Sequence, residues 1–219
     1  MSHVKHAIIS AAGLGSRLGL DMPKCLLQIN HKPIIEYQLE LLRTVEDVRV
    51  VVGFLEDQVI DTIKRLRRDV VFIRNPLYRT TSTSYSLHLA TKDLQDSFLI
   101  IDGDLLINPK SFETFLQRCN GQASIIGITR AKTEDAVFVE VQNQQIVRFH
   151  RRPQTDYEWC GVAFLKDLPI NKDLIYIYEE LEKRCPLDCH EIECYEIDTP
   201  ADYQQAIQFF DHFDRLDVR

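Results

Sequence analysis

The chain has 219 residues, of which 45% are hydrophobic and 27% are charged, and its formal net charge at pH 7 is −7. This content can bury the core of one α/β domain, so we interpret residues 1–219 as a single domain. The acidic balance argues against nucleic acid or an anionic membrane as a partner. No apolar run reaches the roughly 20 residues of a membrane helix, and the first ten residues lack a signal-peptide core, so we expect a cytoplasmic protein.

The first half of the chain alternates between β-branched runs and amphipathic stretches. Runs that predict strands lie at residues 5–11, 47–54, 70–75 and 97–104. Patterns typical of helices lie at residues 33–44, 56–68 and 81–94. Strands that alternate with helices predict βαβ units, and so an α/β fold with a Rossmann-like, mainly parallel mixed sheet and helices on both faces.

The pattern changes after residue 109. A predicted helix at 109–119 leads into closely spaced predicted strands at residues 123–130, 136–143, 145–152 and 158–165. Short strands with turn residues between them predict an antiparallel addition to the sheet or a small antiparallel flap. The chain continues with a predicted helix at 170–184, a predicted strand at 190–197 and a final helix that Thr199 can cap.

A glycine-rich loop follows the first predicted strand. It carries Arg17 and Lys24 on its arms and glycines at positions 13, 15 and 19. Because glycine reaches positive φ and lets a ligand approach the main chain, such a loop can gather backbone N–H groups around phosphate. Pro23 disfavours the helix of the dinucleotide fingerprint, and Lys24 follows proline rather than the glycine of a Walker loop. The loop therefore matches neither motif, and its arms suit a site in which Arg17 and Lys24 close over a polyphosphate.

Two acidic pairs follow predicted strands. Asp102 and Asp104 are two residues apart, so both side chains are expected on one face at the carboxyl end of a strand, where ligands bind in open α/β sheets. Glu196 and Asp198 repeat that spacing farther along the chain. Carboxylates grouped in this way suit a hard divalent cation that bridges phosphate oxygens, whereas the structural alternative at Asp102 is a strand that ends in an Asp-Gly turn.

The six cysteines raise a different question, because three of them lie within ten residues of one another together with His190. The spacing of Cys185, Cys189 and Cys194 contains no C-x-x-C pair and matches no zinc signature well. We therefore interpret the cysteines as reduced thiols, some of which pack in the core.

Taken together, these motifs resemble a known enzyme family. Residues 11–24 are similar to the opening signature of the nucleotidyltransferases that activate sugar phosphates and alcohol phosphates. Further segments of that family are matched in the expected order by Gly53-Phe54 and by residues 100–108, 160–165 and 195–203. The resemblance extends over residues 7–203 and implies the nucleotide-diphospho-sugar transferase-like fold and one nucleotidyltransferase domain.

The resemblance also implies site residues. It places Arg17 at the leaving pyrophosphate and Lys24 at the charge that builds on the α-phosphate. It implies Mg²⁺ as the cofactor, held by Asp104, Glu196 and Asp198. It assigns nucleotide binding to the loop and to positions beyond it: Ala11, Ala12, Gly13, Leu14, Gly15, Ser16, Gly53, Ser86 and Asp102. No general base is needed, because a phosphate monoester is already largely a dianion at neutral pH.

Residues 75–90 distinguish the branches of this family. They are similar to the branch that uses CTP to activate phosphocholine and related amino-alcohol phosphates or phosphonates, although Ser82 and Thr83 stand at or beside its usual asparagines. An ammonium group is held by aromatic rings and a carboxylate. We therefore predict that Tyr157, Trp159 and Tyr195 bind the acceptor. The resemblance adds Gly161 on the substrate-side strand, and we predict Arg151 as a clamp for the acceptor phosphate. The alternatives are Trp159 as a core residue and Arg151 in a solvated basic turn.

The sequence thus predicts a magnesium-dependent cytidylyltransferase, which moves CMP from CTP to a phosphate or phosphonate monoester such as phosphocholine and releases pyrophosphate. A homodimer is kept as a candidate assembly. Two alternatives stay open, a sugar-1-phosphate nucleotidyltransferase that makes an NDP-sugar and a catalytically silent nucleotide-sensing module. The joint presence of Arg17, Lys24, Asp104 and Asp198 argues against the silent module.

Overall fold

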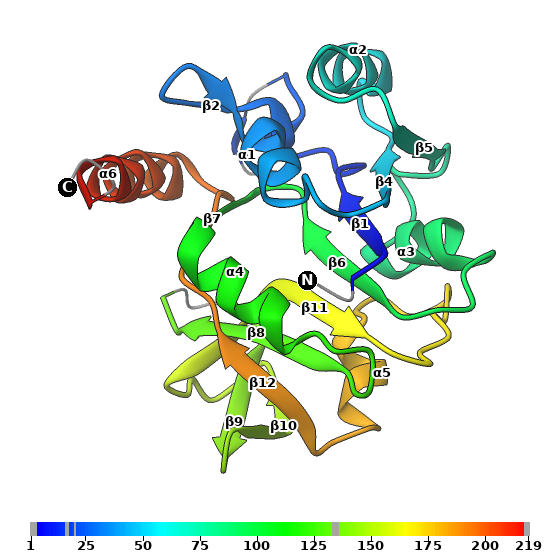
Figure 1. Ribbon diagram of the computed structural model, residues 1–219, viewed down its shortest axis with the longest axis vertical. Helices are drawn as coiled ribbons and strands as arrows, with labels where there is room; N and C mark the ends of the chain where they lie inside the picture. The colour runs from blue at the N-terminus through cyan, green and yellow to red at the C-terminus, as the bar shows by residue number, and fades with distance from the viewer. Residues whose placement is uncertain (1–3, 16–17, 20, 133–135, 217–219) are drawn as a thin grey trace.

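The computed structural model describes residues 4–15, 18–19, 21–132 and 136–216, with side chains as far as Phe210. Its main sheet has nine strands, namely β1 (His6–Ser10), β4 (Asp47–Val52), β5 (Val70–Arg74), β6 (Phe98–Asp102), β8 (Ile125–Arg130), β9 (Phe138–Gln142), β10 (Gln145–His150), β11 (Tyr157–Leu165) and β12 (Leu187–Glu191). Their order across the sheet is β5-β4-β1-β6-β11-β8-β12-β10-β9 (Figure 1). The mixed sheet confirms the predicted fold class.

Strands β5, β4, β1 and β6 are all parallel and form what we call the parallel half. The helices α1 (Ile34–Leu41), α2 (Glu56–Leu66) and α3 (Thr83–Thr91) connect them, as the βαβ pattern predicts. In this half Ser10, the last residue of β1, lies in register with Val51 and with Asp102. The carboxyl ends of three strands therefore meet along one edge.

The remaining strands, β8 to β12, form what we call the closed half. Strand β11 runs antiparallel to β6 and to β8, and β12 runs parallel to β8. Strand β10 pairs antiparallel with β12 and β9, and β9 pairs back with β11. The antiparallel strands therefore do not form a separate flap, because the sheet closes on itself at this end.

Two predicted elements differ from the structure. The strand predicted at 190–197 is two strands, β12 and β13 (Cys194–Glu196), because the chain leaves the main sheet after Glu191 and pairs with β7 (Leu105–Ile107) instead. The helix predicted at 170–184 is only the short α5 (Tyr178–Glu182). Its expected first turns are occupied by a tight turn in which Asn171 accepts from the backbone N–H of Asp173.

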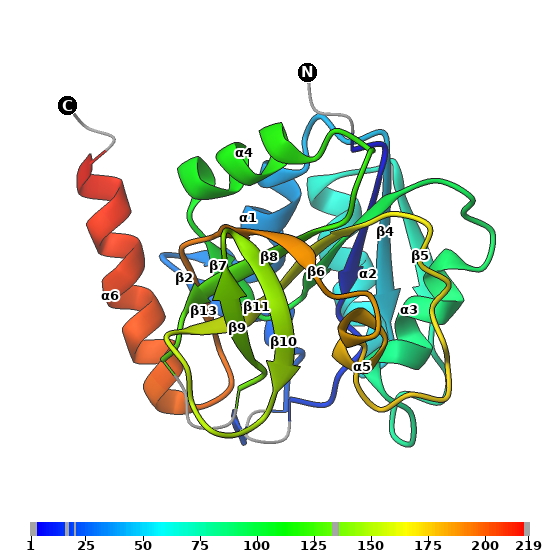
Figure 2. The ribbon, with the colours of Figure 1, turned by 90° about the horizontal axis from the view of Figure 1, so that it is seen from below.

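The sheet carries apolar packing on both faces. Helices α1, α2 and α4 (Pro109–Arg118) cover one face, and α3 and α5 cover the other. A third, smaller cluster packs α6 (Pro200–Leu216) against the β13 side of the molecule, away from α3 (Figure 2). Within the described residues, no helix is both long enough and apolar enough to cross a membrane.

Candidate active site

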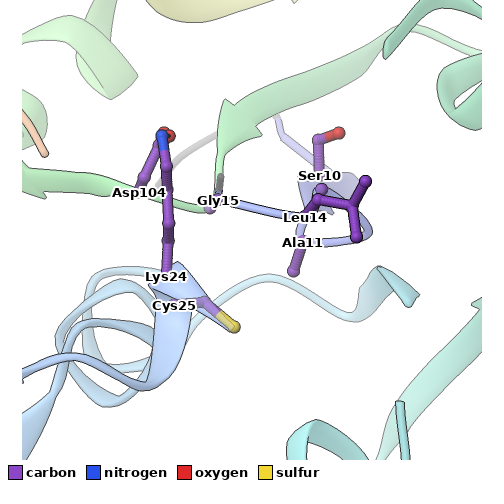
Figure 3. Close-up of a pocket in the computed structure, with 9 residues that line it drawn as sticks. Ser10, Ala11, Leu14, Gly15, Lys24, Cys25 and Asp104 are labelled. Atoms are coloured by element: carbon purple, nitrogen blue, oxygen red, sulfur yellow. Dashed lines mark hydrogen bonds and ion pairs between the residues drawn. The ribbon is translucent and has the colours of Figure 1, made fainter. Parts of the chain in front are cut away.

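The carboxyl ends of β1 and β6 open into a pocket of about 200 Å³ (Figure 3). Its walls come from the glycine-rich loop and from the turn after β6, and the residues are Ser10, Ala11, Gly13, Leu14, Gly15, Lys24, Cys25, Gly103 and Asp104. Four of the predicted nucleotide-binding residues are among them. Ser16 and Arg17 lie outside the described residues, so their contacts stay predictions.

Two glycines permit close approaches in this pocket. Gly15 has a φ of +61°, and a Cβ there would lie 2.9 Å from Cγ of Lys24. At Gly103, a Cβ would lie only 2.7 Å from the carbonyl oxygen of Ser10. A side chain at either position would displace the loop or the lysine stem, so the glycines fix where the pocket walls meet.

Lys24 begins a short 3₁₀ turn, Lys24–Leu26, directly after Pro23. Its Nζ donates to Oδ2 of Asp104 at 2.8 Å and also to Oδ1 of Asp198. Burial acts to lower the pKa of this ammonium, but the two carboxylates outweigh it and the pKa is raised. The charge is therefore fixed at the mouth of the loop, where Figure 3 shows the lysine side chain extended toward Asp104.

Asp104 does not extend from a strand as predicted, because β6 ends at Asp102 and Asp104 lies in the following turn. The turn is held by Gln38 of α1, whose Nε2 donates to the carbonyl oxygens of Asp102 and Leu105, each at 2.9 Å. Gln38 is completely buried. No sequence pattern indicates this role, since a glutamine in an amphipathic helix is ordinary.

Strand β13 brings the second acidic pair to the same place. Glu196 lies in register with Leu105, and the backbone N–H of Ile197 donates to the carbonyl oxygen of Asp104 at 3.1 Å. Beyond Asp198, Oδ2 of Asp202 accepts from the backbone N–H of Thr199 at 2.7 Å, and the Thr199 hydroxyl accepts from that of Asp202. This capping box confirms the predicted start of the final helix and fixes the backbone around Asp198.

The three predicted metal ligands are brought together. One carboxylate oxygen from each of Asp104, Glu196 and Asp198 lies within 4.8 Å of the others. Loss of hydration and repulsion from the two aspartates raise the pKa of Glu196, although the side chain as a whole is exposed. A divalent cation would relieve this repulsion, and carboxylate oxygens are its preferred ligands, so the residues fit Mg²⁺.

Asp102 lies against β11, the strand of the closed half that pairs with β6. Gly161 in β11 has a φ of +74°, and a Cβ there would lie 2.5 Å from Oδ2 of Asp102. Burial, together with repulsion from Asp104, raises the pKa of Asp102 to about 8. Gly161, which was predicted at the acceptor, thus lies against Asp102, which was predicted at the nucleotide.

Two further nucleotide-side predictions have structural contacts. The backbone N–H of Phe54 donates to the carbonyl oxygen of Ala12 at 3.2 Å, and a Cβ at Gly53 would lie 2.9 Å from that oxygen. The absence of a side chain at Gly53 thus lets the glycine-rich loop pack closely against the end of β4. The hydroxyl of Ser86 accepts from Nδ2 of Asn75 at 3.0 Å and the residue is buried, so it stabilises the turn before α3.

The three predicted acceptor rings pack against two different apolar clusters. Tyr157 and Trp159 pack against the cluster shared with α3 and α5, whereas Tyr195 packs in the α6 cluster with Phe209, at 4.3 Å between ring centroids. The indole N–H of Trp159 donates to the carbonyl oxygen of Val162. The alternative of Trp159 as a core residue agrees with these contacts, and its place in an acceptor cage stays a prediction.

Cations of the chain itself cover rings on this side. The Arg130 guanidinium lies 4.4 Å from the ring centroid of Tyr157, and Nζ of Lys132 lies 4.0 Å from that of Tyr195. Arg151, the predicted phosphate clamp, lies 5.2 Å from the ring centroid of Tyr176, next to α5. The sequence did not single out Arg130 or Lys132.

All six cysteines are free thiols. Burial raises the pKa of Cys25, beside Lys24, to about 12, which makes it a poor nucleophile. Among the described residues, the side chains that are grouped closely enough to hold a metal ion are the carboxylates of Asp104, Glu196 and Asp198.

Relatives of known activity match parts of the chain. A choline-phosphate cytidylyltransferase of Streptococcus pneumoniae (strain ATCC BAA-255 / R6) is 38% identical over 117 residues, which are 51% of this chain and 50% of that protein. A CTP:phosphoglutamine cytidylyltransferase of Campylobacter jejuni (serotype O:2) is 31% identical over 140 residues, or 62% of this chain and 52% of that one. The chain thus matches about half the length of these two curated relatives.

Solved structures match nearly the whole chain. The structure of a CTP:phosphocholine cytidylyltransferase from Streptococcus pneumoniae has a TM-score of 0.78 and 26% identity, and covers 94% of this chain and 100% of that one. Among family models, that of the MobA-like NTP transferase domain matches residues 7–161, which is more than half of the chain. With this match and the shared fold, the chain belongs to the MobA-like NTP transferase domain family.

Proposed function

We propose that this protein transfers a cytidylyl group from CTP to a phosphate or phosphonate monoester and releases pyrophosphate. The observation that carries the proposal is the contact of Lys24 with both Asp104 and Asp198 at the mouth of a pocket walled by the glycine-rich loop. A cation and three carboxylates at the end of such a loop suit a triphosphate. The relatives named above act with CTP, which favours this nucleotide.

Each group has a role in this proposal. The backbone N–H groups of residues 12–15 would bind triphosphate oxygens, and Lys24 would stabilise the negative charge that develops at the α-phosphate. Arg17 would neutralise pyrophosphate as it leaves. Mg²⁺, held by Asp104, Glu196 and Asp198, would supply charge neutralisation and orientation at the phosphates when bound. The acceptor phosphate attacks as a dianion, so positioning replaces a general base.

For the acceptor we propose a phosphorylated compound with an ammonium group, such as phosphocholine. Support comes from the sequence of residues 75–90, which is similar to the phosphocholine branch, and from the names of the relatives, choline-phosphate and phosphoglutamine cytidylyltransferases. The structures of enzymes that act on sugar phosphates share the fold at 17–18% identity, which carries no argument about the substrate. The sugar-phosphate alternative is therefore an outcome of the test.

The test is a panel of reactions with purified protein and Mg²⁺, monitored by pyrophosphate release. The four common nucleoside triphosphates are combined with phosphocholine, phosphoethanolamine, an aminoalkylphosphonate and several sugar 1-phosphates. We expect the highest rates with CTP and one of the amino compounds. Preference for a sugar 1-phosphate would replace the acceptor assignment, and the absence of release with every pair would contradict nucleotidyl transfer itself.

A further inference from the structure

Lys132 connects the closed half of the sheet to the strand that carries a predicted metal ligand. It follows β8, and its backbone N–H donates to Oε2 of Glu158 at 3.2 Å. Its Nζ donates to the carbonyl oxygen of Cys194 at 2.5 Å and lies over the ring of Tyr195. Both of these partners belong to β13, directly before Glu196. The ammonium is therefore held against β13, two residues before Glu196.

The ammonium of Lys132 has no acidic partner among the residues that the structure describes. Within the described part of the chain, no carboxylate oxygen lies within 4.0 Å of its Nζ, whereas Lys24 is paired with two. A lysine ammonium has three N–H donors. One is used by the carbonyl oxygen of Cys194 and one side of the ammonium faces the Tyr195 ring, which leaves donor capacity for an anion. Lys132 is an exposed residue, so a ligand can reach it.

The reaction needs a cation on the acceptor side. An attacking phosphate dianion approaches a triphosphate that is also negative, and the repulsion must be offset where the acceptor binds. Lys24 comes from the loop side of the cluster and Lys132 comes from the closed half. The two lysines therefore come from different parts of the fold, and only Lys24 contacts the carboxylates. Arg151, the clamp predicted from the sequence, lies instead at Tyr176 beside α5.

We infer that Lys132 binds the phosphate or phosphonate group of the acceptor. The inference rests on the proposed function. While Lys132 covers Tyr195, that ring face is closed to an ammonium group. Tyr195 thus helps to position the lysine and does not hold the amino end of the acceptor. The part of the acceptor that Lys132 recognises is its dianion, which every acceptor shares.

The experiment compares Lys132→Met and Lys132→Arg with the unchanged protein, using CTP and the acceptor that reacts fastest in the panel. Methionine keeps a long apolar side chain over Tyr195 but removes the charge, whereas arginine restores the charge. We expect Lys132→Met to raise the KM of the acceptor on the order of 10- to 100-fold, the loss typical of a charged hydrogen bond. The KM of CTP should stay within about twofold, and Lys132→Arg should recover most of the acceptor affinity.

Lys166→Met is the matched control, because Nζ of Lys166 also donates to a backbone carbonyl oxygen, that of Gln122, but beyond the opposite end of β11. It should leave both KM values unchanged. An unchanged acceptor KM in Lys132→Met, or an equal rise for CTP, would overturn the assignment of Lys132 while nucleotidyl transfer stands. Failure of the unchanged protein to release pyrophosphate with any pair would overturn the proposed function and this inference together.

Discussion

The parallel half and the closed half of the sheet contribute to the candidate site in different ways. In the parallel half, the glycine loop, Lys24 and Asp104 follow strand ends that lie side by side, so residues near strand ends in sequence meet in space. In the closed half, Lys132 reaches β13 across 62 residues of sequence. The pocket walls thus depend on loops that follow neighbouring strands, whereas Asp198 and the contacts on the proposed acceptor side depend on long-range packing.

The largest effect should come from Asp104 and Asp198, two of the carboxylates proposed to hold Mg²⁺. Asp104→Asn and Asp198→Asn each keep side-chain volume but remove a charged ligand, and we expect kcat to fall roughly 100-fold or more. Steady-state pyrophosphate release under saturating Mg²⁺ measures this, with circular dichroism to show that each variant is folded. Near-normal turnover in either variant would remove that residue from the metal site.

The next effect tests whether the parallel half serves all acceptors alike. Lys24→Ala should lower kcat/KM by a similar factor for every acceptor, on the order of 2 to 4 kcal/mol if the ammonium contacts charge in the transition state. The comparison needs at least two acceptors of different head group. A loss confined to one of them would place Lys24 on the acceptor side and erase the distinction between the halves.

A smaller effect should come from Gln38, which reaches the site only through the backbone. Gln38→Met removes both hydrogen bonds to the turn that carries Asp104, and two unsatisfied buried carbonyl groups should cost about 1 to 3 kcal/mol each in unfolding free energy. Urea unfolding measures this. If Gln38 positions Asp104, the variant should also need more Mg²⁺ for half-maximal activity, whereas a purely structural role would leave that concentration unchanged.

The predictions from sequence held where the pattern is local. The βαβ order and the Thr199 cap follow from residues within a few positions, and the structure has them. The break between β12 and β13 could not be predicted, because the backbone N–H of Ile192 is satisfied by Ile128 and the next strand pairs with β7. Gln38 and Lys132 were missed for the same reason, since their partners lie far away in sequence.

The smallest effect on catalysis should come from Trp159, if its contacts are those of a core residue. Trp159→Phe should cost about 1 to 3 kcal/mol of unfolding free energy, because it leaves a void and removes the donor to Val162. The acceptor KM should change less than about threefold. A selective rise in acceptor KM without loss of stability would restore this ring to the acceptor site.

The central claim is nucleotidyl transfer, and ³¹P NMR of a single reaction tests it most directly. Protein, Mg²⁺, CTP and phosphocholine are mixed, and the spectrum is followed over time. We expect the phosphomonoester signal to be replaced by the paired signals of a CDP-linked product, with one pyrophosphate formed for each CTP consumed. Loss of CTP to CDP and inorganic phosphate, or CTP that remains unchanged with every acceptor of the panel, would contradict the claim.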